Sequence, residues 1–207
     1  MSKHKDIDII DYGLSNIFSV SNAVTKLGYK ANITSSSETI LNSNCLILPG
    51  VGYFSEGIER IINLNLYDAI KHAVNIKKTP ILGICLGMQL LSNSSTEGTF
   101  NKGLGLIDCE VDLFGSTKSN FNLKLPHIGF SSIEENQNSI LLRNIPNNCL
   151  DFYFVHTYRI MHMQSDVICS YSNYGEKFVS LFENKNVFGT QFHPEKSQSN
   201  GLLLLKN

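Results

Sequence analysis

The segment PILGICLGMQLL, residues 80–91, decides the fold of this chain. Residues 81–84 form a fully apolar run typical of a buried strand, and the leucines that follow recur at helical spacing. Between them lies GICLG, residues 83–87, the G-x-C-x-G form of a nucleophile elbow with Cys85 in place of serine. Cys85 would begin a helix, where the dipole favours a thiolate and the amide of Leu86 can donate to an oxyanion. A buried strand cysteine between incidental glycines explains the pentapeptide equally well.

Two earlier segments repeat the change from apolar strand to helix. Residues 7–10 are followed by apolar positions at three- and four-residue intervals up to Gly28, which ends the predicted helix. Residues 45–48 run into the break PGVG, residues 49–52, and then into a helical pattern over residues 58–73. Apolar strands that alternate with amphipathic helices predict a parallel sheet covered on both faces.

After about Gly103 the helical spacing nearly disappears, and short β-rich runs take its place. The runs span residues 111–114, 128–133, 152–156, 167–171, 178–182 and 187–192. We expect antiparallel or mixed strands that extend the same sheet, closed by a C-terminal helix from about Ser197. No repeat or linker interrupts the pattern, so residues 1–207 are predicted to form a single α/β domain with a mixed, mostly parallel sheet.

Composition and charge argue against several classes of protein. The chain has 207 residues, with Lys and Arg totalling 17 against 18 for Asp and Glu, so no basic surface for nucleic acid is expected. No apolar stretch approaches the roughly 18 residues of a membrane span, and the N-terminus has no signal-peptide core. Five cysteines without a CxxC pair disfavour disulfides and zinc. We therefore expect a cytoplasmic protein without a metal or other cofactor.

A nucleophilic thiol needs a general base, and His193 is the best placed of the histidines. It follows residues 187–192 at the carboxyl end of a predicted strand, the edge at which open α/β sheets build their sites. Glu195 lies two residues on, so in extended backbone the carboxylate could orient the imidazole. Taken alone, the HxE pattern fits two surface polar residues as well. The other candidate bases are His4, His72, His127, His156 and His162.

The loop PGVGY, residues 49–53, follows the strand before the elbow strand. Its glycines allow backbone amides to face the crevice, which suits an oxyanion hole completed by the elbow. It lacks the Lys-Ser/Thr of a P-loop and does not match GxGxxG, so phosphate or dinucleotide binding is not favoured. A plain tight turn explains this loop alone equally well.

Seven motifs in this order resemble the class I (triad) glutamine amidotransferases, and among them the glutaminase subunits of imidazole glycerol phosphate synthase. They are DYGLSN (11–16), LPGVGYF (48–54), GICLGMQLL (83–91), GLGLI (103–107), PHIG (126–129), YFVHTY (153–158) and QFHPEKS (191–197). The likeness covers nearly the whole chain, and it implies the class I glutamine amidotransferase fold. It also implies hydrolysis of L-glutamine to glutamate and ammonia through a γ-glutamyl thioester.

The resemblance implies a role for each residue that matches a family motif. Cys85 would be the nucleophile, His193 the acid and base, and Glu195 the partner that orients His193. The remaining matches are Gly52 and Leu86 for the oxyanion hole; Gly50, Gln89, Glu97, His156, Thr157 and Tyr158 for the substrate; and Asn16, Phe130 and Lys196 for a partner protein. That partner would be a HisF-like cyclase subunit, a (β/α)₈ barrel that takes up the ammonia in a heterodimer, since the motifs leave no domain for an acceptor.

Three positions depart from the family pattern: Ser15 replaces a second glycine, Phe130 replaces a tryptophan and Thr157 replaces a serine. The first two lie in segments that face the partner in the family, so they bear on partner identity. One alternative is the same glutaminase chemistry feeding an amidotransferase of cell-surface polysaccharide biosynthesis. A cysteine protease or a γ-glutamyl hydrolase is an alternative with more similar chemistry. Gln89 favours free glutamine as the substrate over the substrates of these two enzymes. A non-catalytic regulatory subunit is the alternative of another class, and the intact triad argues against it.

Overall fold

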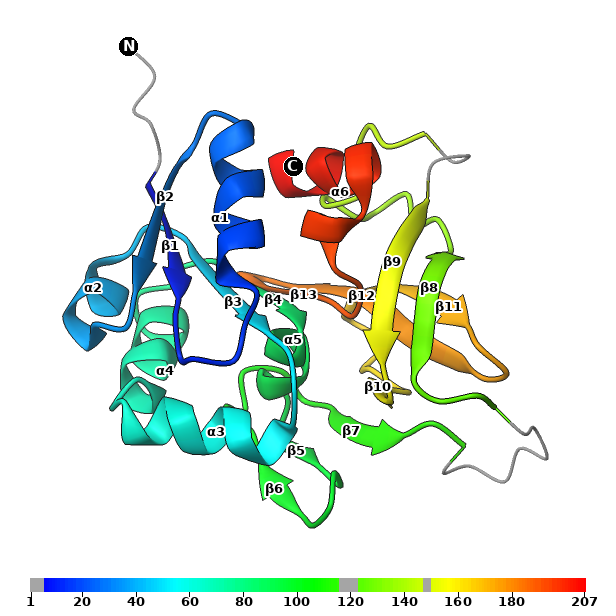
Figure 1. The fold of residues 1–207 in the computed structure, drawn as a ribbon, viewed down its shortest axis with the longest axis horizontal. Coiled ribbons are helices and arrows are strands. Elements are labelled where there is room, and N and C mark those ends of the chain that lie inside the picture. The colour runs from blue at the N-terminus through cyan, green and yellow to red at the C-terminus, as the bar shows by residue number, and fades with distance from the viewer. Residues whose placement is uncertain (1–5, 116–122, 147–149) are drawn as a thin grey trace.

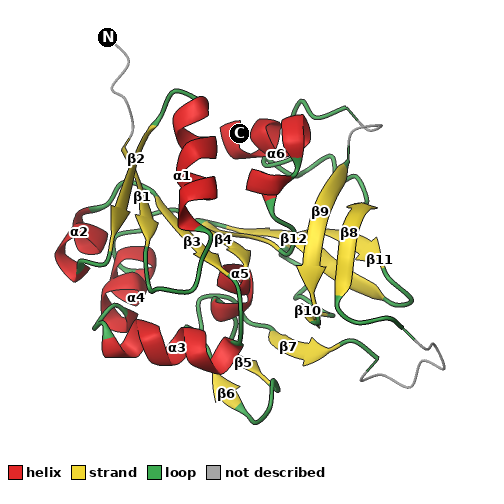
Figure 2. Ribbon diagram, in the orientation of Figure 1, coloured by secondary structure: helices red, strands yellow, loops and turns green. Residues whose placement is uncertain are grey.

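The computed structural model describes residues 6–115, 123–146 and 150–207, and in this part of the chain eleven strands form one sheet and two form another (Figure 1, Figure 2). His4, a candidate base, and Cys149 lie outside the described residues. No helix in the described ranges has the length and hydropathy needed to cross a membrane.

The strands alternate with helices in the first half and follow one another in the second. The strands are β1 (Asp6–Ile10), β2 (Lys30–Thr34), β3 (Leu46–Gly50), β4 (Ile81–Cys85), β5 (Ser94–Ser95), β6 (Asn101–Lys102), β7 (Glu110–Leu113), β8 (His127–Ser132), β9 (Asp151–His156), β10 (Tyr158–Ile160), β11 (Ile168–Asn173), β12 (Lys177–Asn184) and β13 (Val187–Thr190). The helices are α1 (Ile17–Lys26), α2 (Ser37–Asn42), α3 (Phe54–Asn63), α4 (Tyr67–Asn75), α5 (Leu86–Leu90), the 3₁₀ turn η2 (Pro194–Lys196) and α6 (Gln198–Lys206).

The main sheet has a parallel half and a mixed half. The order β2-β1-β3-β4-β13 is parallel throughout, and β12 then pairs antiparallel with β13. The order continues β12-β10-β7-β5-β6, with β11 paired to β12. The predicted mixed, mostly parallel α/β sheet is therefore confirmed.

Two strands of the second half do not join the main sheet as expected. β8 and β9 pair only with each other, in an antiparallel two-stranded sheet. Alternate residues of β9 are buried, and Phe152 and Phe154 pack with Phe178 of β12, Phe192 and Leu204 of α6. Because the buried face of β9 carries two phenylalanines, the strand packs face-on against the rest of the core and does not extend an edge.

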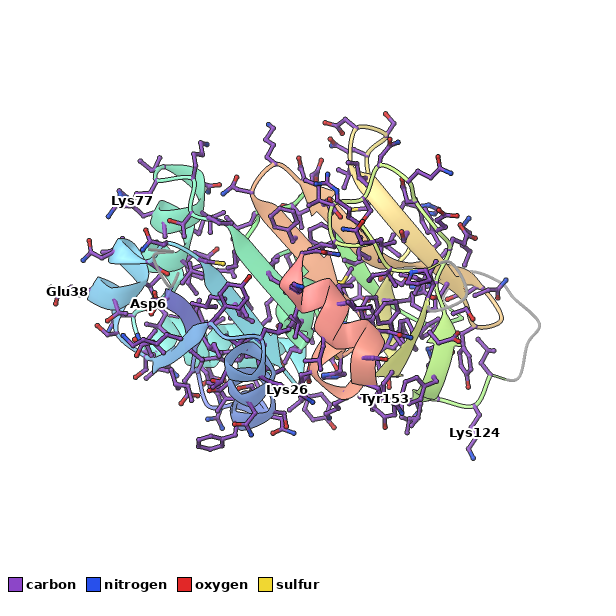
Figure 3. The ribbon with its side chains drawn as sticks, turned by 90° about the horizontal axis from the view of Figure 1, so that it is seen from above. Asp6, Lys26, Glu38, Lys77, Lys124 and Tyr153 are labelled. Atoms are coloured by element: carbon purple, nitrogen blue, oxygen red, sulfur yellow. The ribbon has the colours of Figure 1, made fainter. Side chains whose placement is uncertain are left out.

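Helices cover both faces of the sheet. In Figure 1, α1 and α6 lie above the parallel strands, and α3, α4 and α5 lie below them. Figure 3, which labels Lys26 of α1 and Tyr153 of β9, shows α6 between these two elements, and α6 contacts both. The helix expected over residues 58–73 is two helices, because Asn65 takes a positive φ of 56° between α3 and α4. The apolar spacing continues across this turn, so the pattern gave no sign of it.

The fold places four chain segments at one edge of the sheet. β1, β3, β4 and β13 are parallel, so their carboxyl ends meet there. Tyr12 follows β1, Gly50 ends β3, Cys85 ends β4 and Gln191 follows β13. This is the edge at which open α/β sheets bind their ligands.

Candidate active site

The elbow has the strained backbone that the G-x-C-x-G pattern predicts. Cys85 has φ 54° and ψ −109°, in the positive-φ region that non-glycine residues rarely occupy. A Cβ on Gly87 would lie 1.7 Å from the carbonyl oxygen of Leu48, and one on Gly83 would lie 2.7 Å from the amide of Met88. Only glycine therefore lets α5 pack this closely against β3 and β4.

His193 and Glu195 form a buried pair beside the elbow. Nδ1 of His193 lies 2.7 Å from Oε1 of Glu195, and each side chain is 2% exposed. The segment after His193 is not extended as expected but turns as the 3₁₀ helix η2, and this turn brings the carboxylate back to the imidazole. Since Nδ1 contacts Glu195, Nε2 is the nitrogen left for Cys85. No described residue makes a hydrogen bond of normal geometry to Nε2.

The charges around His193 favour its protonated form. Burial lowers the pKa of His193, but the interaction with Cys85 and the hydrogen bond to Glu195 raise it, and the net pKa is about 10. An imidazolium between a sulfur and a carboxylate is the arrangement that keeps a thiolate next to its proton donor.

A cavity of about 520 Å³ opens above Cys85 and brings most of the predicted residues together. Its lining residues are Val51, Gly52, Tyr53, Cys85, Leu86, Gln89, Glu97, Pro126, Val155, His156, Thr157, Tyr158 and Lys196. Five predicted residues do not line it: Gly50 lies opposite Cys85 in the sheet, His193 and Glu195 are buried behind the cavity wall, and Asn16 and Phe130 are exposed. A Cβ on Gly50 would lie 2.1 Å from the hydroxyl of Tyr12, so this position also requires glycine.

Gln89 and Glu97 each make hydrogen bonds that fix their orientation. Nε2 of Gln89 donates to the carbonyl of Tyr158 at 2.9 Å and to Oε1 of Gln191 at 3.0 Å. Oε2 of Glu97 accepts from the amide of Phe54 at 2.7 Å. Burial raises the pKa of Glu97, and the bond to Phe54 opposes the shift. The single side-chain oxygen of Gln89 and the other carboxylate oxygen of Glu97 are left for a ligand with N–H groups, such as an amide or an ammonium.

His156 lines the cavity, but both of its ring nitrogens are used inside the protein. Nδ1 lies 2.9 Å from the carbonyl of Tyr158, which can only accept, so Nδ1 carries the proton. Nε2 then accepts from Nδ1 of His127 at 3.1 Å, and Nε2 of His127 accepts from the hydroxyl of Ser131 at 2.9 Å. Burial lowers the pKa of His156 to about 3 and that of His127 to about 4. His156 is thus a neutral support for Tyr158.

The loop before α3 does not present all its amides to Cys85. The amide of Val51 donates to the carbonyl of Leu14 at 2.8 Å, and Gly52 has a φ of 106°. In this conformation the first turn of α5, beginning at Leu86, supplies the amides nearest the thiol. In this conformation the Val51 amide is therefore not available to a group bound at Cys85.

Two of the three residues predicted to face a partner are exposed, and the third lines the cavity. Phe130 is 51% exposed, and its ring packs edge-on against Tyr153 with centroids 5.6 Å apart. Asn16 is exposed at the start of α1 and makes no side-chain capping bond. Lys196 lines the cavity itself.

Gln191 was given no role from the sequence, but it is buried and its Nε2 lies 3.8 Å from Sγ of Cys85. The available signal was the two-residue spacing from Gln191 to His193, which puts both side chains on one face of an extended segment. Tyr12, buried beneath the loop, was also given no role, and nothing in its motif indicated one. The described residues contain no cluster of three or more His, Cys, Asp or Glu side chains able to hold a metal ion.

Comparisons with known proteins agree with this geometry. The family model described as glutamine amidotransferase class-I matches residues 8–207. The HisH 1 subunit of imidazole glycerol phosphate synthase from Parasynechococcus marenigrum (strain WH8102) is 44% identical over 203 residues, 97% of this chain and 95% of the relative. The HisH 2 subunit from Methanococcus maripaludis is 41% identical, with 97% of each chain covered. A crystal structure described as a glutamine amidotransferase shares the fold with a TM-score of 0.72 at 16% identity, covering 97% of this chain and 96% of the other.

Proposed function

The chain belongs to the class I glutamine amidotransferases and, within them, to the HisH subunits of imidazole glycerol phosphate synthase, and on this premise we propose that Cys85, His193 and Glu195 carry its glutaminase reaction. The protein is an enzyme, and its glutaminase activity serves histidine biosynthesis. One observation carries the choice of residues: the His193–Glu195 contact of 2.7 Å lies beside a cysteine held at positive φ.

The proposed reaction has two halves. The Cys85 thiolate attacks the side-chain amide carbon of L-glutamine, and the protonated His193 gives its proton to the departing ammonia, leaving a γ-glutamyl thioester. His193 then takes a proton from water, which attacks the thioester and releases glutamate. Glu195 holds the imidazole in the orientation that both steps need, through its contact with Nδ1.

Glutamine is the substrate that the cavity chemistry supports best. The free oxygen of Gln89 can accept from the substrate's amide, and the carboxylate of Glu97 can pair with its α-ammonium. Thr157 and Tyr158 complete the proposed substrate site, with His156 acting through Tyr158. Gly50, also proposed for the substrate, lies opposite Cys85 in the sheet. The amide of Leu86 is one proposed oxyanion donor, and the Val51–Gly52 segment would supply the other after it rearranges.

We further propose that residues 1–207 act as one glutaminase domain paired with a HisF-like (β/α)₈ cyclase subunit. Asn16, Phe130 and Lys196 would contact that subunit, and ammonia would pass to it without entering bulk solvent. Cys85, Cys109 and Cys169 are thiols, which suits the reducing cytoplasm that we propose as its location.

Ser15 and Phe130 depart from the family pattern in segments that face the partner, so they bear on partner identity. The second candidate acceptor is an amidotransferase of cell-surface polysaccharide biosynthesis. The hydroxyl of Ser15 is buried and meets no hydrogen-bonding partner among the described residues. Genetic complementation distinguishes the two candidate acceptors. Restored growth of a histidine auxotroph that lacks its own glutaminase subunit supports the histidine acceptor, and failure together with restored surface polysaccharide supports the other.

The glutaminase proposal is tested by labelling with diazo-oxo-norleucine, an alkylating analogue of glutamine. We expect the label on Cys85 alone, and we expect Cys85→Ala to lose both labelling and ammonia release. Cys45→Ala is the control, because Cys45 lies at the opposite end of the parallel strands, next to β3. Ammonia release by Cys85→Ala at the wild-type rate would overturn the proposal.

A further inference from the structure

The sulfur of Cys85 has two polar neighbours besides His193. The carbonyl oxygen of Val155 lies 3.7 Å away and Nε2 of Gln191 lies 3.8 Å away, both within the range of hydrogen bonds to sulfur. Gln191 is fully buried, and its backbone amide is held by the carbonyl of Ser180. Gln191 and His193 therefore approach the sulfur from the same chain segment.

Neighbouring groups determine which end of the Gln191 amide faces the sulfur. The carbonyl of Tyr158 can only accept, so the atom of Gln89 that lies 2.9 Å from it must be the nitrogen. The same nitrogen lies 3.0 Å from the Gln191 side chain, which must present its oxygen there. The nitrogen of Gln191 is then the atom left for Cys85. The reverse orientation would set two N–H groups against each other and an oxygen against the sulfur.

The two neighbours suit different ionisation states of Cys85. A thiol can donate its proton to the carbonyl of Val155, but a thiolate has nothing to donate and is repelled by that oxygen. A thiolate is instead stabilised by N–H donors, and Gln191 presents one in a dry setting where such bonds are strong.

We propose that Gln191 is a catalytic residue that donates a hydrogen bond to the Cys85 thiolate, and that Gln89 sets the orientation of its amide for this purpose. The inference rests on Cys85 being the nucleophile, as proposed above. Gln191 does not line the cavity, so its contribution falls on the reactivity of the sulfur and not on binding of glutamine.

Other charged groups also act on Cys85 and set the background for any test by pH. His193 faces it from the segment between β13 and η2, Glu195 of η2 acts through its contact with His193, and Tyr12 faces Cys85 from the loop after β1. Glu97 and Lys196 line the cavity above it. All of these groups stay in place when only residue 191 is changed, so a shift in the pH profile reports on Gln191.

The test compares two substitutions that remove different parts of the amide. Gln191→Glu keeps an oxygen for Gln89 to donate to, but it replaces the donor at the sulfur with a negative oxygen. Gln191→Leu removes both groups, and it is the second variant should the buried carboxylate prevent folding. We measure the rate of iodoacetamide labelling at Cys85 against pH on the purified chain, with the labelled peptide identified by mass spectrometry and Cys85→Ala as the blank.

We expect the labelling midpoint to move up by about one pH unit or more in both variants, the size of one hydrogen bond to a charged group. In Gln191→Glu, kcat for glutamine should fall about tenfold or more, with KM within about twofold of wild type. Gln191→Leu should also raise KM, because Gln89 loses an acceptor. Thr190→Val is the matched control: Thr190 is equally buried, ends β13 next to Gln191 and donates its hydroxyl to the carbonyl of Phe192. This variant should leave the profile unchanged.

A wild-type labelling profile and kcat in Gln191→Glu would overturn the inference, since Gln191 would then serve only to hold Gln89. An equal shift in Thr190→Val would overturn it as well, because general loosening of β13 would explain the data. Failure of the glutaminase proposal has a different signature, namely ammonia release that survives Cys85→Ala.

Discussion

The imidazole of His193 lies between the sulfur of Cys85 and the carboxylate of Glu195. In the proposed reaction it first donates a proton and later accepts one. The ring keeps the first proton until ammonia leaves in that reaction, and it then takes another from water. Residues close in sequence make this pair, so the HxE motif together with the cysteine elbow was enough to predict it. The positive φ of Cys85 was equally predictable, because the glycines of the elbow are local.

Replacing Glu195 tests the charge that this carboxylate supplies. Burial lowers the pKa of His193, while Cys85 and Glu195 raise it to about 10. Glu195→Gln removes the second raising charge, so the pKa of His193 falls and the protonated form is lost at lower pH. We expect kcat to fall by about 10² or more and the alkaline limb of the kcat/KM profile to move to lower pH.

The control for this experiment is Glu56→Gln. Glu56 forms an ion pair of 2.8 Å with Arg60 on the exposed face of α3, away from the catalytic pair. Its profile should match wild type. An alkaline limb that stays in place in Glu195→Gln would show that this carboxylate does not hold the imidazolium.

In the proposed reaction, the backbone amides of the loop between β3 and α3 determine how many donors stabilise the oxyanion. The Val51 amide is bound to the carbonyl of Leu14, and the φ of Gly52 is 106°. The two glycines of the loop were readable in the sequence. Its conformation was not, because the acceptor for Val51 belongs to a different βα unit.

Gly52→Ala tests whether the loop acts as a switch. A Cβ at Gly52 meets nothing within 4 Å, so the substitution only penalises the positive φ, by roughly 1–2 kcal/mol. We expect the penalty to disfavour the conformation in which Val51 is bound to Leu14. The glutaminase rate of the isolated chain should then rise, and stimulation by the partner should shrink.

Gly28→Ala is a matched control, because Gly28 has a φ of 87° and equally open space at the end of α1. It should lose similar stability without a change in the stimulation ratio. A lower rate of the isolated Gly52→Ala chain would contradict the switch, since one lost oxyanion donor costs about 10²–10³ in rate.

The two-stranded sheet of β8 and β9 carries the buried histidine pair, in which His127 lies directly opposite His156. Burial lowers the pKa of His127 to about 4 and that of His156 to about 3, against 6.5 for an exposed histidine. Below about pH 6.5 these two histidines therefore bind protons in the unfolded chain but not in the folded chain. Stability is full above that pH, and it falls as the pH drops from 6.5 towards 4.

His127→Asn should make this fall shallower. The asparagine can still donate to His156 but does not titrate, so the loss of unfolding free energy between pH 7 and pH 5 should shrink by about 2 kcal/mol. Denaturant unfolding at both pH values measures it, with His72→Asn as control because His72 is exposed on α4. An unchanged difference in His127→Asn would show that His127 is not held neutral.

At the scale of the whole molecule, exposed apolar side chains lie on the segments that the family motifs place towards a partner. Phe130 and Ile128 of β8 are 51% and 60% exposed, and Tyr53 beside the cavity is 66% exposed. Exposed apolar groups that lie close together mark protein interfaces, and aromatic residues are enriched among interface hot spots.

Phe130→Asp tests whether this surface holds the cyclase subunit. We expect Kd for the partner to rise by about tenfold or more, with diazo-oxo-norleucine labelling of Cys85 in the isolated chain unchanged. Ile76→Asp is the control, because Ile76 is similarly exposed but precedes β4 at the opposite edge of the sheet. Equal weakening in both variants would argue against a partner surface on β8.

The sequence by itself determined the features that arise within a few residues: the elbow, the pairing of His193 with Glu195, and the succession of apolar strands and amphipathic helices that predicts a parallel sheet. Only the tertiary structure decided the separate pairing of β8 with β9, the bond from Val51 to Leu14 and the placement of Gln191 against the sulfur. Each of these joins residues distant in the chain, and their positions follow from how whole elements pack. Local spacing carries no information about which distant group will fill a given hydrogen-bonding position.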